Sequence, residues 1–129
     1  MGGSASKPVV LKKEHVTSAL KDGMVFRFLK EDDDKKGYFE LLAQLTPSPP
    51  VAHKDFAARV LLLRNSKAVH TVVLEDIRSK RIIGTGTIVI EPKFIHGNGH
   101  VGHIEDVVVD KNSRNAHVGR RYAARMPVF

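Results

Sequence analysis

The sequence predicts an α+β domain in which a mainly antiparallel sheet is flanked by helices. Two stretches with apolar residues at helical spacing lie in the first half of the chain. Three β-branched, apolar stretches joined by short connections follow them. The expected order is therefore strand, helix, helix, three strands and a final helix, and strands that follow one another through short turns pair antiparallel.

The first strand is expected at residues 24–29, after a flexible tail over 1–22. Residues 23–129 then form a single domain. Phe26 and Phe28 alternate with Arg27, which is the period of two that a strand requires, and Arg27 is expected to face outward.

Two helices are expected next. Acidic residues at 31–34 favour a helix N-terminus. The helix that follows has its apolar residues spaced i, i+3, i+4 and i+7; they are Tyr38, Leu41, Leu42 and Leu45. The prolines within 46–50 must end this helix. A second helix is expected over 53–65, with one apolar face formed by Phe56, Val60 and Leu63.

Three strands form the expected meander. Residues 69–75 and 82–90 are rich in β-branched residues and are joined by a charged turn. Gly84 and Gly86 in the second of these strands allow a close approach or a bulge. A connection rich in Gly and His, over 92–102, leads to the last strand at 103–109, and a basic segment at 114–126 is expected to be helical.

Composition restricts the class of protein. The 129 residues are 42% hydrophobic and 27% charged, as in an ordinary globular domain. A net charge of +7 favours anionic partners such as nucleic acid, a membrane surface or a phosphate-bearing ligand. The absence of cysteine excludes disulfides, thiolate metal sites and a cysteine nucleophile. No apolar run reaches the roughly 20 residues of a membrane span, and no secretory signal begins the chain, so a cytoplasmic protein is expected.

Three further features of the sequence admit other interpretations. The start of the chain fits an N-myristoylation pattern, so membrane binding is expected only if Gly2 is acylated. The spacing of His96, His100 and His103 could bind zinc, but no helical face aligns these residues and no metal is expected. The basic C-terminal segment could bind nucleic acid, yet it lacks interleaved aromatic residues, so no nucleic-acid partner is expected.

Three segments carry a resemblance to a known family. They read GHIEDVVV at 102–109, IEPKFIHG at 90–97 and GYFELLAQLT at 37–46. Taken in chain order, within a resemblance that runs from about Phe26 to Gly119, they resemble the glucosamine 6-phosphate N-acetyltransferases of the GNAT superfamily. The resemblance implies the GNAT acyl-CoA N-acyltransferase fold. It also implies transfer of an acetyl group from acetyl-CoA to the 2-amino group of glucosamine 6-phosphate, giving N-acetylglucosamine 6-phosphate for UDP-N-acetylglucosamine synthesis.

The same resemblance implies roles for individual residues. Glu105 and Asp106 match the catalytic pair beside the acceptor amine, and direct attack without an acyl-enzyme is expected, with a backbone N–H near Val107 or Val108 donating to the oxyanion. The implied substrate-binding residues are Thr46, Lys93, Phe94, Ile95, His96, Glu105, Asp106 and Val107. The implied acetyl-CoA-binding residues are Val107, Val108, Val109, Arg114, Asn115, Ala116, His117, Val118, Gly119 and Arg120.

The sequence also departs from the family. His117 stands where the phosphate-binding loop of the family has its first glycine, and a Cβ there is expected to crowd the pyrophosphate. Members of the family have further helices and strands after the position that corresponds to residue 129. The chain is therefore expected to lack the C-terminal part of the fold. The last strand then has an exposed edge, and a homodimer is expected. The alternative function is a catalytically impaired remnant that binds CoA or pairs with a full-length partner.

Overall fold

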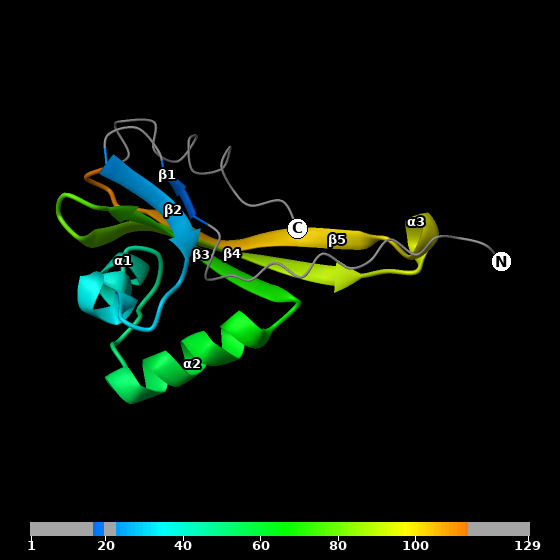
Figure 1. Ribbon diagram of the computed structural model, residues 1–129, viewed down its shortest axis with the longest axis horizontal. Coiled ribbons are helices and arrows are strands. Elements are labelled where there is room, and N and C mark those ends of the chain that lie inside the picture. Colours follow the sequence, from blue (N-terminus) through cyan, green and yellow to red (C-terminus); the bar gives the residue numbers. More distant parts are fainter. Residues whose placement is uncertain (1–16, 20–22, 114–129) are drawn as a thin grey trace.

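The computed structural model describes residues 17–19 and 23–113 (Figure 1). Its centre is a five-stranded sheet whose strands stand in chain order, with every neighbouring pair antiparallel. The strands are β1 (Thr17–Ala19), β2 (Met24–Phe28), β3 (Val69–Asp76), β4 (Arg81–Pro92) and β5 (His100–Val109). The helical elements are the 3₁₀ helix η3 (Asp33–Lys36), α1 (Tyr38–Leu42), α2 (His53–Asn65) and α3 (Ile95–Asn98). The predicted α+β class and antiparallel meander are confirmed.

The sheet buries apolar side chains on both faces, because successive residues of a strand point to opposite sides. One buried cluster consists of Phe26, Phe28, Val72, Leu74, Ile83 and Val109. The other brings the strands against the helices and consists of Leu29, Tyr38, Leu41, Phe56, Val60, Val73, Ile82 and Val108. Helices α1 and α2 lie on the same side of the sheet (Figure 1). The second cluster therefore fixes the helices relative to the buried end of β5.

The first predicted helix is shorter than expected. Residues 33–45 form η3 and then α1, which ends at Leu42, so the continuous helix predicted through Leu45 is wrong and Leu45 is exposed. Gly37, between the two elements, has a φ of 83°, a left-handed conformation that interrupts a helix. The guanidinium of Arg81 lies where a side chain at this position would be. The second helix, over His53–Asn65, matches its predicted bounds.

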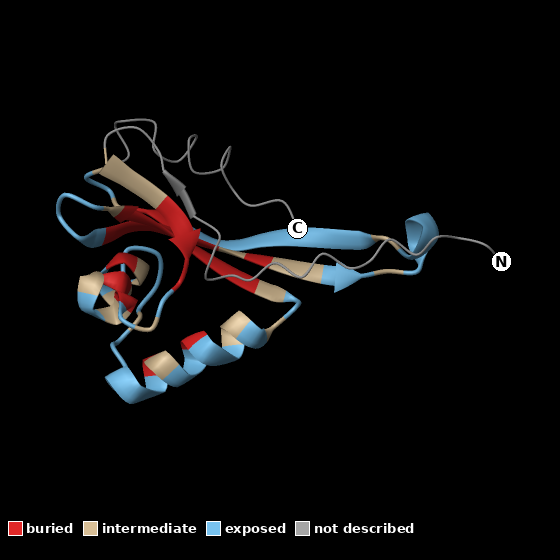
Figure 2. Cartoon of the chain, viewed as in Figure 1, coloured by how far each residue is buried: buried red, intermediate tan, exposed pale blue. Residues whose placement is uncertain are grey.

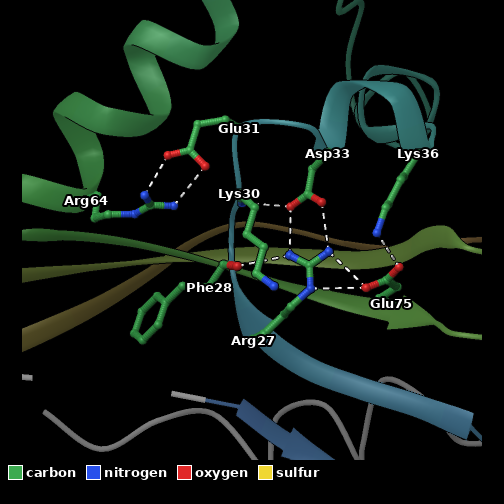
Figure 3. A network of polar contacts seen from close by, with 8 residues as sticks. All are labelled: Arg27, Phe28, Lys30, Glu31, Asp33, Lys36, Arg64 and Glu75. Carbon is green, nitrogen blue, oxygen red and sulfur yellow. Dashed lines mark hydrogen bonds and ion pairs between the residues drawn. The ribbon is translucent and has the colours of Figure 1, made fainter. Parts of the chain in front are cut away.

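The prediction that Arg27 faces outward is also wrong. Its side chain lies on the sheet face opposite Phe26 and Phe28, but that face is covered and Arg27 is buried. Figure 3 shows its guanidinium between Asp33 and Glu75. One further N–H donates to the carbonyl of Phe28, so all five guanidinium N–H groups have acceptors. Alternation identified the strand, but it could not show that both faces of the sheet are buried.

Strands β4 and β5 continue beyond the core as a two-stranded ribbon (Figure 1). Both are longer than the predicted ranges, 82–90 and 103–109. Residues 100–107 are exposed, whereas Val108 and Val109 are buried, and Figure 2 shows this change along the ribbon. In addition, β1 lies within the segment predicted as a flexible tail, and it pairs with β2. No helix in the part of the chain that the structure describes is long and apolar enough to cross a bilayer.

Candidate functional site at the β5 bulge

The pairing of β4 with β5 is interrupted by a β-bulge. Thr85 pairs with Val108, and Thr87 pairs with Glu105. A single residue of β4, Gly86, therefore faces two residues of β5, Asp106 and Val107. Asp106 has a φ of 54°, the left-handed conformation that a side chain rarely adopts outside such a feature. Of the two features expected at Gly84 and Gly86, a close approach or a bulge, the structure has a bulge opposite Gly86, within the segment predicted to be catalytic.

The bulge lies on an edge strand. Among the residues that the structure describes, β5 pairs only with β4, so its outer backbone edge faces away from the sheet. Glu105 and Asp106 are exposed there, and Val107 is 43% exposed. An edge with unpaired N–H and C=O groups can take an extended ligand as an added strand. The bulge redirects the backbone of this edge and places two carboxylates beside it.

Helix α1 and the residues after it hold the end of β5. The side chain of Gln44 donates from Nε2 to Asp110 Oδ1 at 3.3 Å and accepts from the Lys111 amide at 2.9 Å. Thr46 follows two residues later and is exposed, with its carbonyl accepting from Ser48 Oγ at 2.9 Å. The predicted sugar-binding Thr46 is therefore anchored through Gln44 to the end of the strand that carries the bulge.

The remaining predicted substrate residues lie at the other end of the ribbon. Lys93 Nζ lies 2.7 Å from Glu91 Oε1, and His103 Nε2 lies 2.9 Å from Glu91 Oε2. Both contacts lower the pKa of Glu91, and the contact with Lys93 has the larger effect. Phe94 is 94% exposed, and Ile95 and His96 are exposed beside it.

The ribbon separates these residues from the carboxylates. From His100 to Asp106 the strand advances roughly 20 Å, at about 3.3 Å per residue. One copy of the described chain thus brings Thr46 near the end of β5, but it does not bring Lys93 or His96 to Asp106. The described residues contain no group of three or more His, Asp or Glu side chains arranged to hold a metal ion.

Comparison with known proteins identifies the fold. The sequence profile described as the acetyltransferase (GNAT) family matches residues 29–126. The chain is 37% identical over 123 residues to glucosamine 6-phosphate N-acetyltransferase 1 of Oryza sativa subsp. japonica, covering 93% of this chain and 74% of that protein. It is 40% identical over 96 residues to glucosamine 6-phosphate N-acetyltransferase of Arabidopsis thaliana, covering 74% and 64%. The chain belongs to the GNAT family of acetyltransferases.

Solved structures agree with this assignment. The crystal structure of glucosamine-6-phosphate N-acetyltransferase from Arabidopsis thaliana superposes with a TM-score of 0.73 at 36% identity, covering 78% of this chain and 69% of that one. An acetyltransferase from Trypanosoma brucei gives a TM-score of 0.69, also at 36% identity, covering 78% of this chain and 70% of that one. This GNAT chain thus spans about two thirds to three quarters of the length of these relatives.

Part of the predicted acetyl-CoA site of this GNAT chain lies outside the described residues. That part comprises Arg114, Asn115, Ala116, His117, Val118, Gly119 and Arg120. The acylation pattern at Gly2 and the basic segment at 114–126 also lie outside them. Of the predicted acetyl-CoA-binding residues, the structure describes Val107, Val108 and Val109. Val108 and Val109 are buried.

Sequence reasoning missed the polar groups of this GNAT chain that pack beneath the bulge. Tyr38 was assigned only to an apolar helix face, and Thr85 only to a strand. Both side chains are buried, burial is the main cause that raises the pKa of Tyr38, and Thr85 Oγ1 donates to the Val72 carbonyl at 2.8 Å. The available signal was the tyrosine itself, because a buried tyrosine hydroxyl usually finds a polar partner.

Proposed function

We propose that this chain transfers the acetyl group of acetyl-CoA to the 2-amino group of glucosamine 6-phosphate, giving N-acetylglucosamine 6-phosphate for UDP-N-acetylglucosamine synthesis. The observation that carries the proposal is the β5 bulge, which places Glu105 and Asp106 at an open strand edge. The names of the rice and Arabidopsis relatives support the acceptor. The family assignment supports acetyl-CoA as the donor.

The chemistry follows from the properties of the edge. The thioester arm of acetyl-CoA adds to β5 as an extended strand along the segment that contains Val107 and Val108. The amine attacks the thioester carbonyl directly, and an N–H near the bulge donates to the oxyanion as charge develops. The adduct collapses with cleavage of the C–S bond, and CoA leaves as the thiolate. The proton that the amine gives up balances the proton that the thiolate takes up, so the products are the amide and free CoA. Glu105 and Asp106 accept hydrogen bonds from the attacking amine and orient it. Residues 114–120 bind the pyrophosphate in this proposal.

The sugar site is proposed to form between two copies of the chain. In one copy, Lys93 and His96 are separated from Asp106 along the ribbon by roughly 20 Å, a span that a hexose phosphate cannot bridge. Lys93 and His96 of one copy then bind the sugar phosphate, with Phe94 and Ile95 packing on the sugar. Thr46 and Asp106 of the other copy hold the ring and the amine. The exposed Phe94, Ile95 and Ile104 supply apolar surface for such a homodimer.

Release of free CoA from acetyl-CoA, followed with a thiol reagent, tests the proposed activity. We expect release to depend on glucosamine 6-phosphate and to be absent with glucose 6-phosphate, which has no amine. CoA binding without sugar-dependent release would contradict the proposal and support the alternative, an impaired remnant that binds CoA or pairs with a full-length partner. Light scattering tests the homodimer, and a monomer that turns over substrate would refute it. We propose a cytoplasmic location for the enzyme, because its proposed substrates are soluble.

A further inference from the structure

Gln44 contacts the end of β5 through both polar atoms of its side-chain amide. Its Nε2 donates to Asp110 Oδ1 at 3.3 Å, and its Oε1 accepts from the Lys111 amide at 2.9 Å. An ionised carboxylate can only accept and a backbone N–H can only donate, so the two partners together require one donor and one acceptor from the same side chain. The glutamine amide supplies both, whereas a glutamate would set a second carboxylate against Asp110.

The residues that follow β5 form a turn over 110–113, called the β5 turn below. Asp110 closes this turn: its Oδ1 also accepts from the Asn112 amide at 3.1 Å, and its carbonyl accepts from the Ser113 amide at 2.8 Å. The chain passes from the β5 turn directly into residues 114–120, to which the proposed function assigns the pyrophosphate. The side chain of α1 that holds the turn therefore acts next to the proposed acetyl-CoA site.

The backbone of Gln44 is fixed to α1. Its amide donates to the Leu41 carbonyl at 3.0 Å, and Leu41 is 2% exposed in the cluster that joins the helices to the sheet. The Thr46 amide donates to the Leu42 carbonyl, also at 3.0 Å. Gln44 and Thr46 thus lie on one short piece of backbone, and the proposed function places Thr46 on the sugar.

The link between this backbone and the β5 turn is weak enough to respond to ligands. It consists of two exposed hydrogen bonds, and an exposed hydrogen bond has a small net effect because water competes for both partners. The linked and unlinked states then differ little in free energy, so a ligand that prefers the linked state shifts the population toward it. Two ligands that both prefer this state must strengthen the binding of each other by the same factor.

We propose that Gln44 is a positioning residue that links the two substrate sites of the chain: it holds the β5 turn relative to Thr46, so that CoA and glucosamine 6-phosphate each strengthen the binding of the other. The effect on the two ligands rests on the proposed function. The link between Thr46 and the β5 turn does not. Gln44 touches neither substrate in this role and acts through Asp110 and Lys111.

Amide resonances of the chain without ligands test the link. Asp110→Ala removes one partner of Gln44, and we expect it to shift the amide resonance of Thr46. Gln44→Leu is close in size and removes both hydrogen bonds, so in the Gln44→Leu chain the further change Asp110→Ala should leave Thr46 unmoved. Asn112→Ala alters the same turn but removes no partner of Gln44, and it should not move Thr46 either.

Calorimetry with CoA, in the absence and presence of saturating glucosamine 6-phosphate, tests the effect on the ligands. CoA has no acetyl group to transfer, so binding is measured without reaction. We expect the sugar to tighten CoA binding about fivefold in the unaltered chain, the scale of one to two net hydrogen bonds. It should have no effect in Gln44→Leu or in Gln44→Glu. Asn65→Leu, which removes an exposed amide from the end of α2, should keep the fivefold effect.

Three results would overturn the proposal. They are equal coupling of the two ligands in Gln44→Leu and the unaltered chain, equal loss of coupling in Asn65→Leu, and no coupling in an unaltered chain that binds both ligands. A Thr46 resonance that Asp110→Ala shifts equally with and without Gln44 would also overturn it. If the unaltered chain does not bind both ligands, the proposed function fails, and the Thr46 resonance still decides whether Gln44 links this residue to the β5 turn.

Discussion

Arg27 and Asp33 form a two-pronged ion pair, with Nη1 and Nη2 of the guanidinium 2.8 and 2.7 Å from the two carboxylate oxygens (Figure 3). Both side chains are almost completely buried. Asp33 also accepts from the Lys30 amide, so the pair joins β2 to the turn that precedes α1. The position of α1, and with it Tyr38, therefore depends on a buried charge pair at the start of the domain.

We expect Asp33→Ala to lower the free energy of unfolding by about 3–5 kcal/mol, because it leaves the Arg27 charge buried with too few acceptors. Urea denaturation measures the loss. Asp32→Ala is the matched control, since Asp32 is 71% exposed and its pair with Lys35 is worth about 1 kcal/mol or less. Equal losses of unfolding free energy in the two variants would show that the buried ion pair contributes no more to stability than the exposed pair.

The stability of the protein should depend on pH through Glu75. Burial tends to raise the pKa of Glu75, but hydrogen bonds from Lys36 and Arg27 outweigh it and hold this pKa below 4.5. A carboxyl whose pKa is lowered by folding stabilises the protein above its unfolded pKa, and this contribution is lost as the pH falls through the folded value.

Urea denaturation between pH 6 and pH 3 tests this dependence. Lys36→Met removes one of the two cations and should make the decline below pH 4.5 less steep than in the unaltered protein. A pH dependence unchanged by Lys36→Met would contradict the assignment to Glu75.

Tyr38 should ionise later than an ordinary tyrosine as the pH rises. Burial is the main cause that raises the pKa of Tyr38 above 10, so its ionised form is disfavoured in the folded state. Stability gained from the neutral hydroxyl is complete below pH 10 and is lost as the pH rises through the folded value. Ultraviolet titration should show a late phenolate step that Tyr38→Phe abolishes. Survival of the late step in that variant would assign it to Tyr122 instead.

The division of roles in the proposed enzyme predicts opposite kinetic signatures. Asp106→Asn should lower turnover with little effect on CoA binding, because it weakens the acceptor beside the amine. Arg120→Ala should weaken CoA binding by removing a phosphate contact. Calorimetry with CoA and initial-rate kinetics separate the two effects. Equal losses of CoA affinity in both variants would refute the division.

Local sequence patterns predicted the elements whose segment carries a single clear signal. Period-two alternation identified β2, and proline and apolar spacing identified α2 with its bounds. The pair Gly84 and Gly86 indicated a possible bulge, and Gly86 lies opposite it. The first helix was overextended because apolar spacing does not reveal that Gly37 adopts a left-handed conformation against Arg81.

The site was predicted less completely, because its parts meet only in three dimensions. The segment around Glu105 and Asp106 was recognised from its resemblance to a family, and the structure adds the bulge that shapes it. Tyr38 of α1 packs in the same buried cluster as Val108 of β5, and no local pattern could reveal a contact between residues so far apart in the sequence. The same holds for Arg27, whose partners Asp33 and Glu75 come from different elements.

The chain-order sheet also has a consequence for how the protein folds. Strands β3 and β4 close over a short turn, whereas β2 can pair with β3 only after residues 29–68 have been brought together as a loop. Loop closure costs more entropy as the loop lengthens, and non-local pairing slows folding. The β3–β4 hairpin is therefore expected to nucleate the domain. Arg27 reaches Glu75 only when β2 pairs with β3. The charges of this ion pair therefore lose their water late in folding, after the β3–β4 hairpin has formed.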